Sequence, residues 1–366
     1  MAIGFPTKAN WAAGDVLTAS AMDDLAGTVN LTQYMKPWNT CLNSNMSIWQ
    51  RGTSISIAAS QTSAYTADRW AISTTTNGAS TVARYATSDT TNLPNIQYCA
   101  RVQRNSGQTG TTGQFFYQSW ETLNSNPSAG KTVVVSFYAR AGATYLSSAT
   151  SSTFKLWSGT GTDQNLLTSF TGQTLVAAST PTLTSGWVRY SFSGAISASA
   201  TQIAFGFDMG AVGTAGLTDY VEITGVQLEQ GSVANTYQPN QATYQGELAA
   251  CQRYYWRATA VTSYSNYGLG QCQGTTTCDA VIPFPVTMRT TPTSVEQTGT
   301  AANYGVSNAA GSVTACSAVP SLTTYFTSNS AANVLFTVAS GLVAGNVGFV
   351  ASNNNFSSYL GFSAEL

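Results

Sequence analysis

Aromatic side chains are the residues of this chain best suited to ligand contact. The face of an aromatic ring packs well against the apolar face of a sugar ring, and the sequence holds 18 tyrosines and 8 tryptophans. We expect glycan contacts from seven of these rings: Tyr117, Trp120, Tyr145, Trp157, Tyr264, Tyr267 and Tyr304. The alternative is a place in the core, which is how we interpret Trp49, Trp70 and Trp187 inside strand-like segments.

The absence of histidine excludes much of catalysis. The chain can form no Ser-His-Asp triad and no Cys-His dyad, and it offers zinc no imidazole ligand. Acid–base chemistry would fall to the 15 aspartates and glutamates, so glycoside cleavage by two carboxylates is the enzymatic alternative. We predict that the protein is not an enzyme and uses no cofactor.

Carboxylates and cysteines give weaker signals. Asp208, Asp219 and Glu222 could ligate a structural calcium ion between strand ends. The six cysteines include no C-x-x-C pair; Cys272 and Cys278 are close enough to bridge a hairpin, whereas reduced buried thiols suit a protein made in a reducing compartment. A net charge of −1 gives no electrostatic footprint for nucleic acid.

Charge is scarce. Charged residues make up 8% of the chain, against about 25% in ordinary soluble domains, and hydroxyl and amide side chains replace them. Such composition, together with many aromatic and β-branched residues, favours exposed β-structure over disorder. Exposed strand edges carry a risk of association that burial in an oligomer removes, so we expect a homo-oligomer.

Three regions must position these residues. Residues 1–37 predict a turn followed by a helix in which Met22, Leu25 and Val29 recur at helical spacing. Residues 38–237 show regularly spaced strand patterns separated by turn residues, typical of one β-sandwich of jelly-roll type. In its last strand, a break in alternation at Gly225 indicates a bulge or a turn. Residues 241–366 predict a second β-sandwich, which opens on a strand over Glu247–Tyr255.

Membrane insertion and export are not expected. The start, MAIGFPTKANW, lacks the apolar stretch of a secretory signal. The most apolar window, Val334 to Ala351, is interrupted by glycine and polar residues, which indicates a buried hairpin and not a membrane span.

Several motifs resemble fibre proteins of tailed bacteriophages. The segment from Trp11 to Leu25 resembles the N-terminal adaptor that docks a fibre to the particle. The motifs WQRGT, YTADRW, GKTVVVSFYARA and GWVRY resemble the carbohydrate-binding-module-like jelly roll of phage fibres. The junction VQLEQG…ANTY…ELAACQRYY resembles the boundary that precedes their C-terminal module, and FPVTMRTTPT with the closing GFSAEL resembles that module. Fold-level likeness alone does not establish a ligand.

This resemblance implies an all-β tail fibre, trimeric and located on the virion. Residues 1–37 would anchor it to a phage tail, neck or head component. The anchoring side chains would be Trp11, Val16, Leu17, Met22 and Leu25. The module 241–366 would be the tip that binds a host cell-surface polysaccharide. A head-decorating or structural fibre without receptor role is the main alternative; a polysaccharide depolymerase is another.

Two further expectations concern the C-terminal module. Its loops Thr259–Asn266, Ala301–Ser312 and Ser352–Ser358 are rich in Tyr, Asn and Ser, as in evolved binding loops, and are expected at the receptor contact. Arg253 and Arg289 are expected to form an intersubunit ion pair with Glu247 or Glu365. In a module with so few charged residues, each charge is expected to have a structural role.

Overall fold

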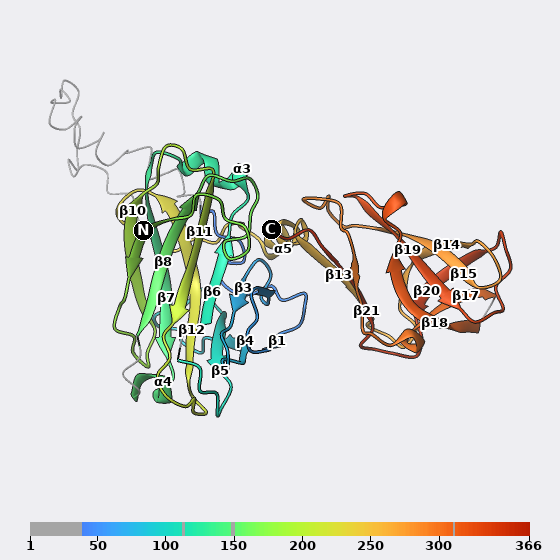
Figure 1. Ribbon diagram of the computed structural model, residues 1–366, viewed down its shortest axis with the longest axis horizontal. Coiled ribbons are helices and arrows are strands. Elements are labelled where there is room, and N and C mark those ends of the chain that lie inside the picture. The colour runs from blue at the N-terminus through green and yellow to red at the C-terminus, as the bar shows by residue number, and fades with distance from the viewer. Residues whose placement is uncertain (1–38, 112–113, 148–150, 310–311) are drawn as a thin grey trace, which may run out of the picture.

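The protein is described here from a computed structural model, in residues 39–111, 114–147, 151–309 and 312–366 (Figure 1). The expected N-terminal adaptor, with Trp11, Val16, Leu17, Met22 and Leu25, lies outside these residues. The all-β prediction is confirmed, since the described helices are short and strands build both modules.

The first module is a sandwich of two six-stranded antiparallel sheets. The first sheet has the order β1 (Ser54–Ile57), β4 (Ser80–Ala86), β5 (Tyr98–Arg104), β12 (Tyr220–Gln230), β7 (Thr132–Ala141) and β10 (Val188–Ala195). The second has the order β2 (Ala64–Tyr65), β3 (Ala71–Ser73), β6 (Gln114–Ser119), β11 (Gln202–Met209), β8 (Ser152–Gly159) and β9 (Thr174–Ser179). Three short helical segments join strands at the ends of the sandwich: α3 (Thr122–Ser125), η1 (Asn126–Ser128) and α4 (Ala143–Ser147).

The core of the sandwich follows the period-2 alternation of its strands. Along β7, Val133, Val135 and Phe137 all face the core, as the sequence predicts. Phe137 stacks on Phe154 of the opposite sheet, with ring centroids 4.1 Å apart. Trp49 and Trp70 lie in this core, and Trp187 is buried in a smaller cluster on the outer side of the first sheet, so the core interpretation of these three rings is confirmed.

The break predicted at Gly225 is a β-bulge. The register of β12 against β7 shifts between Thr224 and Gln227, and Gly225 has a φ of 57°. A left-handed residue in a strand favours glycine because a side chain would be strained there.

A helix, and not the expected strand, begins the second module. Residues Tyr244–Gln252 form α5, capped by the Thr243 side chain, which accepts from the Gly246 backbone N–H at 3.1 Å. Glu247 lies in the first turn, where its charge suits the helix dipole. This capping signal outweighs the strand pattern read over Glu247–Tyr255.

The second module is a closed barrel beside a small sheet, so the expected second sandwich is corrected in this detail. The barrel order is β14 (Asn266–Cys272), β15 (Thr277–Pro283), β19 (Ala331–Val338), β18 (Ser312–Leu322), β17 (Tyr304–Ala309) and β20 (Val347–Ser352). The small sheet has the order β13 (Tyr255–Thr259), β21 (Tyr359–Ser363) and β16 (Val295–Glu296). Closure leaves the barrel without free strand edges. Two short 3-10 turns, η2 (Ala301–Asn303) and η3 (Thr324–Phe326), precede β17 and β19.

The final residues of the chain lie between the two modules, close to α5 (Figure 1). Glu365 forms ion pairs with Arg69 and Arg51 of the jelly roll. The Leu366 carbonyl accepts from the Tyr65 hydroxyl at 3.0 Å. The residues after β21 therefore contact the jelly roll, which begins more than three hundred positions earlier in the chain.

The expected intersubunit ion pairs are instead formed within the chain. Arg253 pairs with Glu121 at 2.6 Å, and Arg289 pairs with Asp163 at 3.5 Å. Both carboxylates belong to the jelly roll, so these charges join the modules of one protomer. Glu247 pairs with neither arginine; its oxygens accept from backbone N–H groups.

Within the described part of the chain, no helix is long and apolar enough to cross a membrane.

Candidate functional site

The seven rings expected to contact glycan do not form one site. Five of them are buried and therefore cannot present a face to a ligand: Tyr117, Trp120, Tyr145, Tyr267 and Tyr304. These five assignments are corrected by the structure. The prediction of these five rings failed because aromatic residue type alone does not separate a ring in the core from a ring on the surface.

Hydrogen bonds explain why these rings are inside. The Tyr117 hydroxyl donates to Asn165 Oδ1 at 2.7 Å, and the Trp120 indole donates to the Thr40 carbonyl at 2.6 Å. The Tyr145 hydroxyl lies 2.8 Å from Ser152 Oγ, and the Tyr304 hydroxyl donates to the Tyr359 carbonyl at 2.7 Å. A buried hydroxyl or indole N–H with a partner is a structural anchor.

Trp157 and Tyr264 remain as predictions. Trp157 is half-buried on the outer face of the second sheet, against the cluster that contains Phe115, Leu166 and Phe170. Tyr264 is 54% exposed in the loop between β13 and β14. These two side chains belong to different modules.

The three carboxylates considered for calcium are each paired with a cation. Glu222 is fully buried and binds both Arg101, at 2.7 Å, and Arg140. Asp219 pairs with Arg104 at 3.0 Å and Asp208 pairs with Lys155 at 3.3 Å. Because the carboxylates lie on separate pairs, the calcium expectation is not supported; no group of metal-ligating side chains occurs among the residues described.

All six cysteines are buried, and none of them forms a disulfide in this structure. Cys272 lies directly opposite Cys278 across β14 and β15. Burial and the neighbouring Cys272 raise the pKa of the Cys278 thiol to about 12, so little thiolate forms near neutral pH.

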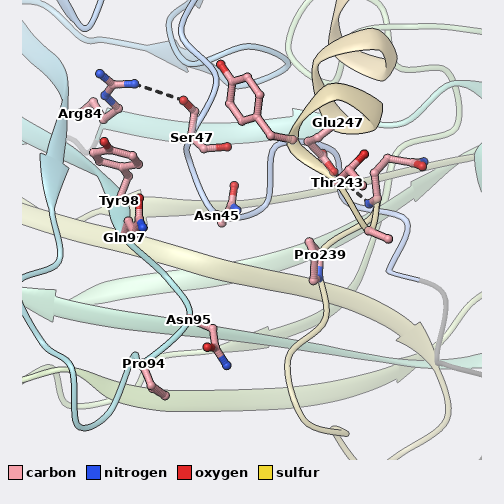
Figure 2. Close-up of a pocket in the computed structure, with 13 residues that line it drawn as sticks. Asn45, Ser47, Arg84, Pro94, Asn95, Gln97, Tyr98, Pro239, Thr243 and Glu247 are labelled. Atoms are coloured by element: carbon pink, nitrogen blue, oxygen red, sulfur yellow. Dashed lines mark hydrogen bonds between the residues drawn. The ribbon is translucent and has the colours of Figure 1, made fainter.

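A hollow of about 670 Å³ lies where the jelly roll meets α5. Its wall on the jelly-roll side comes from β4, β5 and the segments around Asn45 and Asn95, and its other wall comes from residues 239–247 (Figure 2). Arg84 shares the inner face of β4 with the core residue Val82, and Tyr98 shares the inner face of β5 with Ala100. The inner sheet face therefore continues past the core and is covered there by the start of α5.

The lining of this hollow combines stacking and hydrogen-bonding groups. Tyr98 and Tyr244 supply rings, and Arg84 supplies a guanidinium. The amide groups are those of Asn45, Asn95, Gln97 and Gln241, and the hydroxyls are those of Ser47 and Thr243. A concave surface with apolar rings and a few convergent polar groups is the usual form of a small-molecule site.

Glu247 is the one carboxylate in the lining of the hollow. One of its oxygens accepts from the Asn43 backbone N–H, and the other accepts from the Gln241 backbone N–H at 3.0 Å. Burial raises the pKa of this carboxyl, and the two backbone hydrogen bonds oppose that rise. Glu247 thus fixes the wall of the hollow by holding two segments of backbone together.

Sequence reasoning missed Arg84, Tyr98 and Tyr244. One signal was present: in the strand-like stretch STVARYA, alternation places Arg84 on the same face as Val82. A charged residue at an inward position indicates either a buried ion pair or the edge of a cavity. Nothing in the local sequence of Tyr244 brings it to this strand, because that contact depends on how α5 packs.

The expected receptor loops of the second module are partly confirmed as loops. Residues 260–265 and 353–358 are loops joined by hydrogen bonds, such as the Asn355 N–H to the Ser263 carbonyl at 3.1 Å. The segment Ala301–Ser312 is instead largely η2 and β17. Its turn η2 holds the other loops, since the Asn353 N–H donates to the Asn303 carbonyl at 2.8 Å. Val261, Tyr264 and Phe356 are exposed on this cluster of loops.

An apolar stripe crosses the outside of the barrel. Leu269 on β14 lies directly opposite Val281 on β15 and Phe349 on β20. These side chains are 53%, 56% and 51% exposed. Val347 extends the stripe along β20, and Asp279 is the one charged residue in the six barrel strands. Contiguous exposed apolar surface on adjacent strands is typical of an interaction face.

Comparison with known proteins finds likeness in fold. No protein-family model matches the sequence, and no curated protein matches it. Among solved structures, one described as "CBM4 structure and function" shares 20% identity over 36% of this chain and 71% of its own, with a TM-score of 0.26. The CBM22-1 xylan-binding domain of Paenibacillus barcinonensis Xyn10C shares 14% identity over 49% of this chain and 95% of its own, with a TM-score of 0.29.

A further match is the enzymatically active domain of tailspike protein 4 from bacteriophage CBA120. The identity is 12%, the TM-score is 0.33, and the match covers 53% of this chain but 22% of the tailspike chain. Identities and TM-scores are low in all three cases.

Proposed function

We propose that this protein is a non-enzymatic fibre of a tailed-phage virion that attaches the particle to a host surface glycan. The observation that carries the proposal is the hollow between β4, β5 and α5, in which Tyr98 and Tyr244 are surrounded by amides, hydroxyls and Arg84. Rings of this kind stack on the apolar face of a sugar, while amides and hydroxyls recognise its hydroxyl groups.

The sequence resemblance to phage fibres supports the virion part of the proposal. Residues 1–37 are the proposed anchor to a tail, neck or head component, and synthesis takes place in the host cytoplasm. The ion pairs that join the modules suit a fibre, because they fix the direction of the second module relative to the first.

The hollow suits the binding of a glycan without its cleavage. Glycoside hydrolysis takes a pair of carboxyl groups on either side of the scissile bond. The lining supplies Glu247 alone, and both of its oxygens are occupied by backbone N–H groups. The rings and amides therefore bind a sugar and release it uncleaved.

Binding of the full chain to extracted bacterial surface polysaccharides, with release of reducing ends followed in the same samples, tests the proposal. Tyr98→Ala removes a ring from the hollow, and Tyr85→Ala is the matched control, since Tyr85 is exposed on the outer face of the neighbouring strand β4. We expect Tyr98→Ala to weaken binding about tenfold, the effect of losing roughly 1.4 kcal/mol of ring stacking, with Tyr85→Ala unchanged.

Other results would change the conclusion in distinct ways. Equal binding by wild type and Tyr98→Ala, with loss in Tyr264→Ala, would move the site to the loops of the second module. Absence of binding to every polysaccharide would favour a structural or decorating fibre. Release of reducing ends would establish an enzyme.

Self-association, as a homotrimer, is the second part of the proposal. The apolar stripe of Leu269, Val281 and Phe349 is the surface we assign to it, with a second copy of this chain as its occupant. Two surfaces with almost no charge do not repel each other when they meet. The barrel strands provide such a surface, because Asp279 is their one charged residue.

A further inference from the structure

Arg84 differs from most arginines of this protein in having no carboxylate partner. Among the residues described, no aspartate or glutamate lies within ion-pair distance of it. Seven other arginines each hold a carboxylate: Arg51, Arg69, Arg101, Arg104, Arg140, Arg253 and Arg289. A half-buried guanidinium without an anion leaves part of its charge uncompensated.

The guanidinium of Arg84 is nevertheless held in place. Its Nη1 donates to the Ser47 carbonyl at 3.2 Å, and its Cζ lies 4.5 Å from the centroid of the Tyr98 ring. Figure 2 shows Arg84 beside Ser47 and over Tyr98 at one side of the hollow. Its other N–H groups meet no acceptor among the described residues, so they are free for a ligand.

Asn45 lies in the same lining. Its Oδ1 is buried and has no hydrogen-bond donor among the residues described. An acceptor left without a donor in a buried place costs free energy, and because this oxygen is closed to solvent a ligand in the hollow meets the other atoms of Asn45. Figure 2 places Asn45 in the middle of the hollow, between the Arg84–Tyr98 side and the Glu247 side.

We propose that the hollow binds an acidic saccharide whose carboxylate is held by Arg84. This inference rests on the proposed glycan-binding function and adds the class of sugar. The planar guanidinium matches a carboxylate with two parallel hydrogen bonds, and its stacking on Tyr98 fixes the plane of that contact. Glu247 lies on the other side of the hollow from Arg84 (Figure 2), and its two oxygens accept from backbone N–H groups.

A panel of acidic and neutral bacterial polysaccharides tests this inference with the full chain. Each acidic member is measured in its native form and after chemical reduction of its carboxyl groups to hydroxymethyl groups, which keeps the sugar but removes the charge. Phosphate-bearing polysaccharides form a separate arm. We expect binding to native uronic-acid polymers, loss on carboxyl reduction and weakening as salt rises.

Three variants assign the effect to Arg84. Arg84→Gln should weaken binding to the acidic member at least about tenfold, which is the loss of a charged hydrogen bond, and Arg84→Lys should retain part of it. Arg189→Gln is the matched control, because Arg189 also lacks a carboxylate partner and lies outside the hollow; its hydrogen bonds go to Ser136 and Asn235. This control should bind as wild type does.

The outcomes separate this inference from the function on which it rests. Binding that survives carboxyl reduction and the Arg84→Gln change would overturn the acidic-sugar inference and leave glycan binding intact. Binding confined to phosphate-bearing members would overturn the carboxylate assignment. If no member bound, the proposed glycan-binding function itself would fail, and the inference with it.

Discussion

Arg69 and Glu365 form a buried ion pair across 296 positions of sequence and join the jelly roll to the end of the second module. Their side chains are 2% and 4% exposed. Arg69 has a φ of 71°, a backbone conformation that a long side chain rarely adopts. Such a backbone conformation persists only where the surrounding contacts hold it, so the contacts at this junction strongly determine the conformation of Arg69.

The surroundings of the pair contain further rings and charges. The Arg69 guanidinium lies 3.7 Å from the centroid of the Tyr254 ring, and the Tyr254 hydroxyl donates to Glu121 Oε2 at 2.7 Å. Arg51 lies 3.5 Å from the Tyr255 ring centroid and also pairs with Glu365. Both modules thus contribute to one network in which every charged group has a partner.

Glu365→Gln should destabilise the contact between the modules. The change leaves the buried Arg69 without its anion, and removal of one member of a buried pair costs roughly 3–5 kcal/mol. We expect calorimetry to show the two modules unfolding in separate transitions where wild type unfolds in one. Asp208→Asn is the control: its partner Lys155 is 25% exposed, so the loss should stay below about 1 kcal/mol. Equal effects from both variants would contradict this account of the junction.

Gly225→Ala should destabilise the jelly roll. Gly225 has a φ of 57°, and an added Cβ would lie 2.8 Å from Ile96 Cδ1 and 2.9 Å from Tyr138 Cδ2. Backbone strain and crowding together should cost roughly 1–3 kcal/mol of the free energy of unfolding in urea. Gly186→Ala should be neutral or slightly stabilising, because an added Cβ there meets no atom within 4 Å. A neutral Gly225→Ala would mean that the bulge can shift its register.

Local pattern predicted most of the jelly roll because its strands carry their own signals. Alternation places Val133, Val135 and Phe137 correctly in the core, and the break at Gly225 correctly indicates the bulge. The second module was harder to predict. Whether six strands close into a barrel or remain an open sandwich depends on pairing between distant segments, such as β14 with β20, which no local pattern encodes.

The candidate site was less predictable than the fold. Tyr117 and Trp120 have the right chemistry for stacking, but buried partners, Asn165 and the Thr40 carbonyl, hold them inside. Tyr98 becomes part of a hollow only because residues 239–247, about 150 positions later in the chain, form the other wall. Ring type can be read from one sequence, whereas exposure depends on the whole fold.

The free energy of unfolding should fall as pH rises from about 4 to about 6. Burial raises the pKa of Asp68 to about 6, against the opposing effects of Arg51 and the hydrogen bonds from Gln50. Between the unfolded and folded pKa values the folded state binds more protons, so rising pH favours unfolding, by at most about 3 kcal/mol from this group. Asp219 and Glu247 have pKa values raised by burial and act in the same direction.

Urea unfolding at several pH values in that window, for wild type and Asp68→Asn, measures this effect. The variant has no titrating group at position 68, so its slope should be smaller than that of wild type. Identical slopes would show that Asp68 titrates normally in the folded protein.

The native protein should react very slowly with a thiol reagent. All six cysteines are buried, and burial raises the pKa of Cys99, Cys278 and Cys316, so thiolate is scarce. Six thiols should react after unfolding. Ser199→Cys places one exposed thiol on the surface and should add one fast equivalent in the native state. Fast reaction of wild type would contradict the burial of these thiols.

Phe349→Ser should reduce self-association if the apolar stripe is the interface between copies. Phe349 lies between Leu269 and Ser307 on the outside of the barrel and is half exposed, so a serine there removes apolar area without opening the core. At roughly 25 cal/mol per Å² of apolar surface buried, loss of one aromatic ring from each side of an interface weakens association by several kcal/mol. The oligomeric state by light scattering over a range of protein concentrations measures this.

Tyr325→Ser is the control for that measurement, because Tyr325 is the most exposed large hydrophobic side chain among the described residues, at 92%, and lies outside the stripe. If general stickiness of exposed rings caused association, Tyr325→Ser would reduce it at least as much as Phe349→Ser. If the stripe is the interface, only Phe349→Ser should shift the protein toward monomer. A wild-type protein that remains monomeric at high concentration would remove the stripe from consideration, and exposure of Leu269, Val281 and Phe349 would then require a different partner.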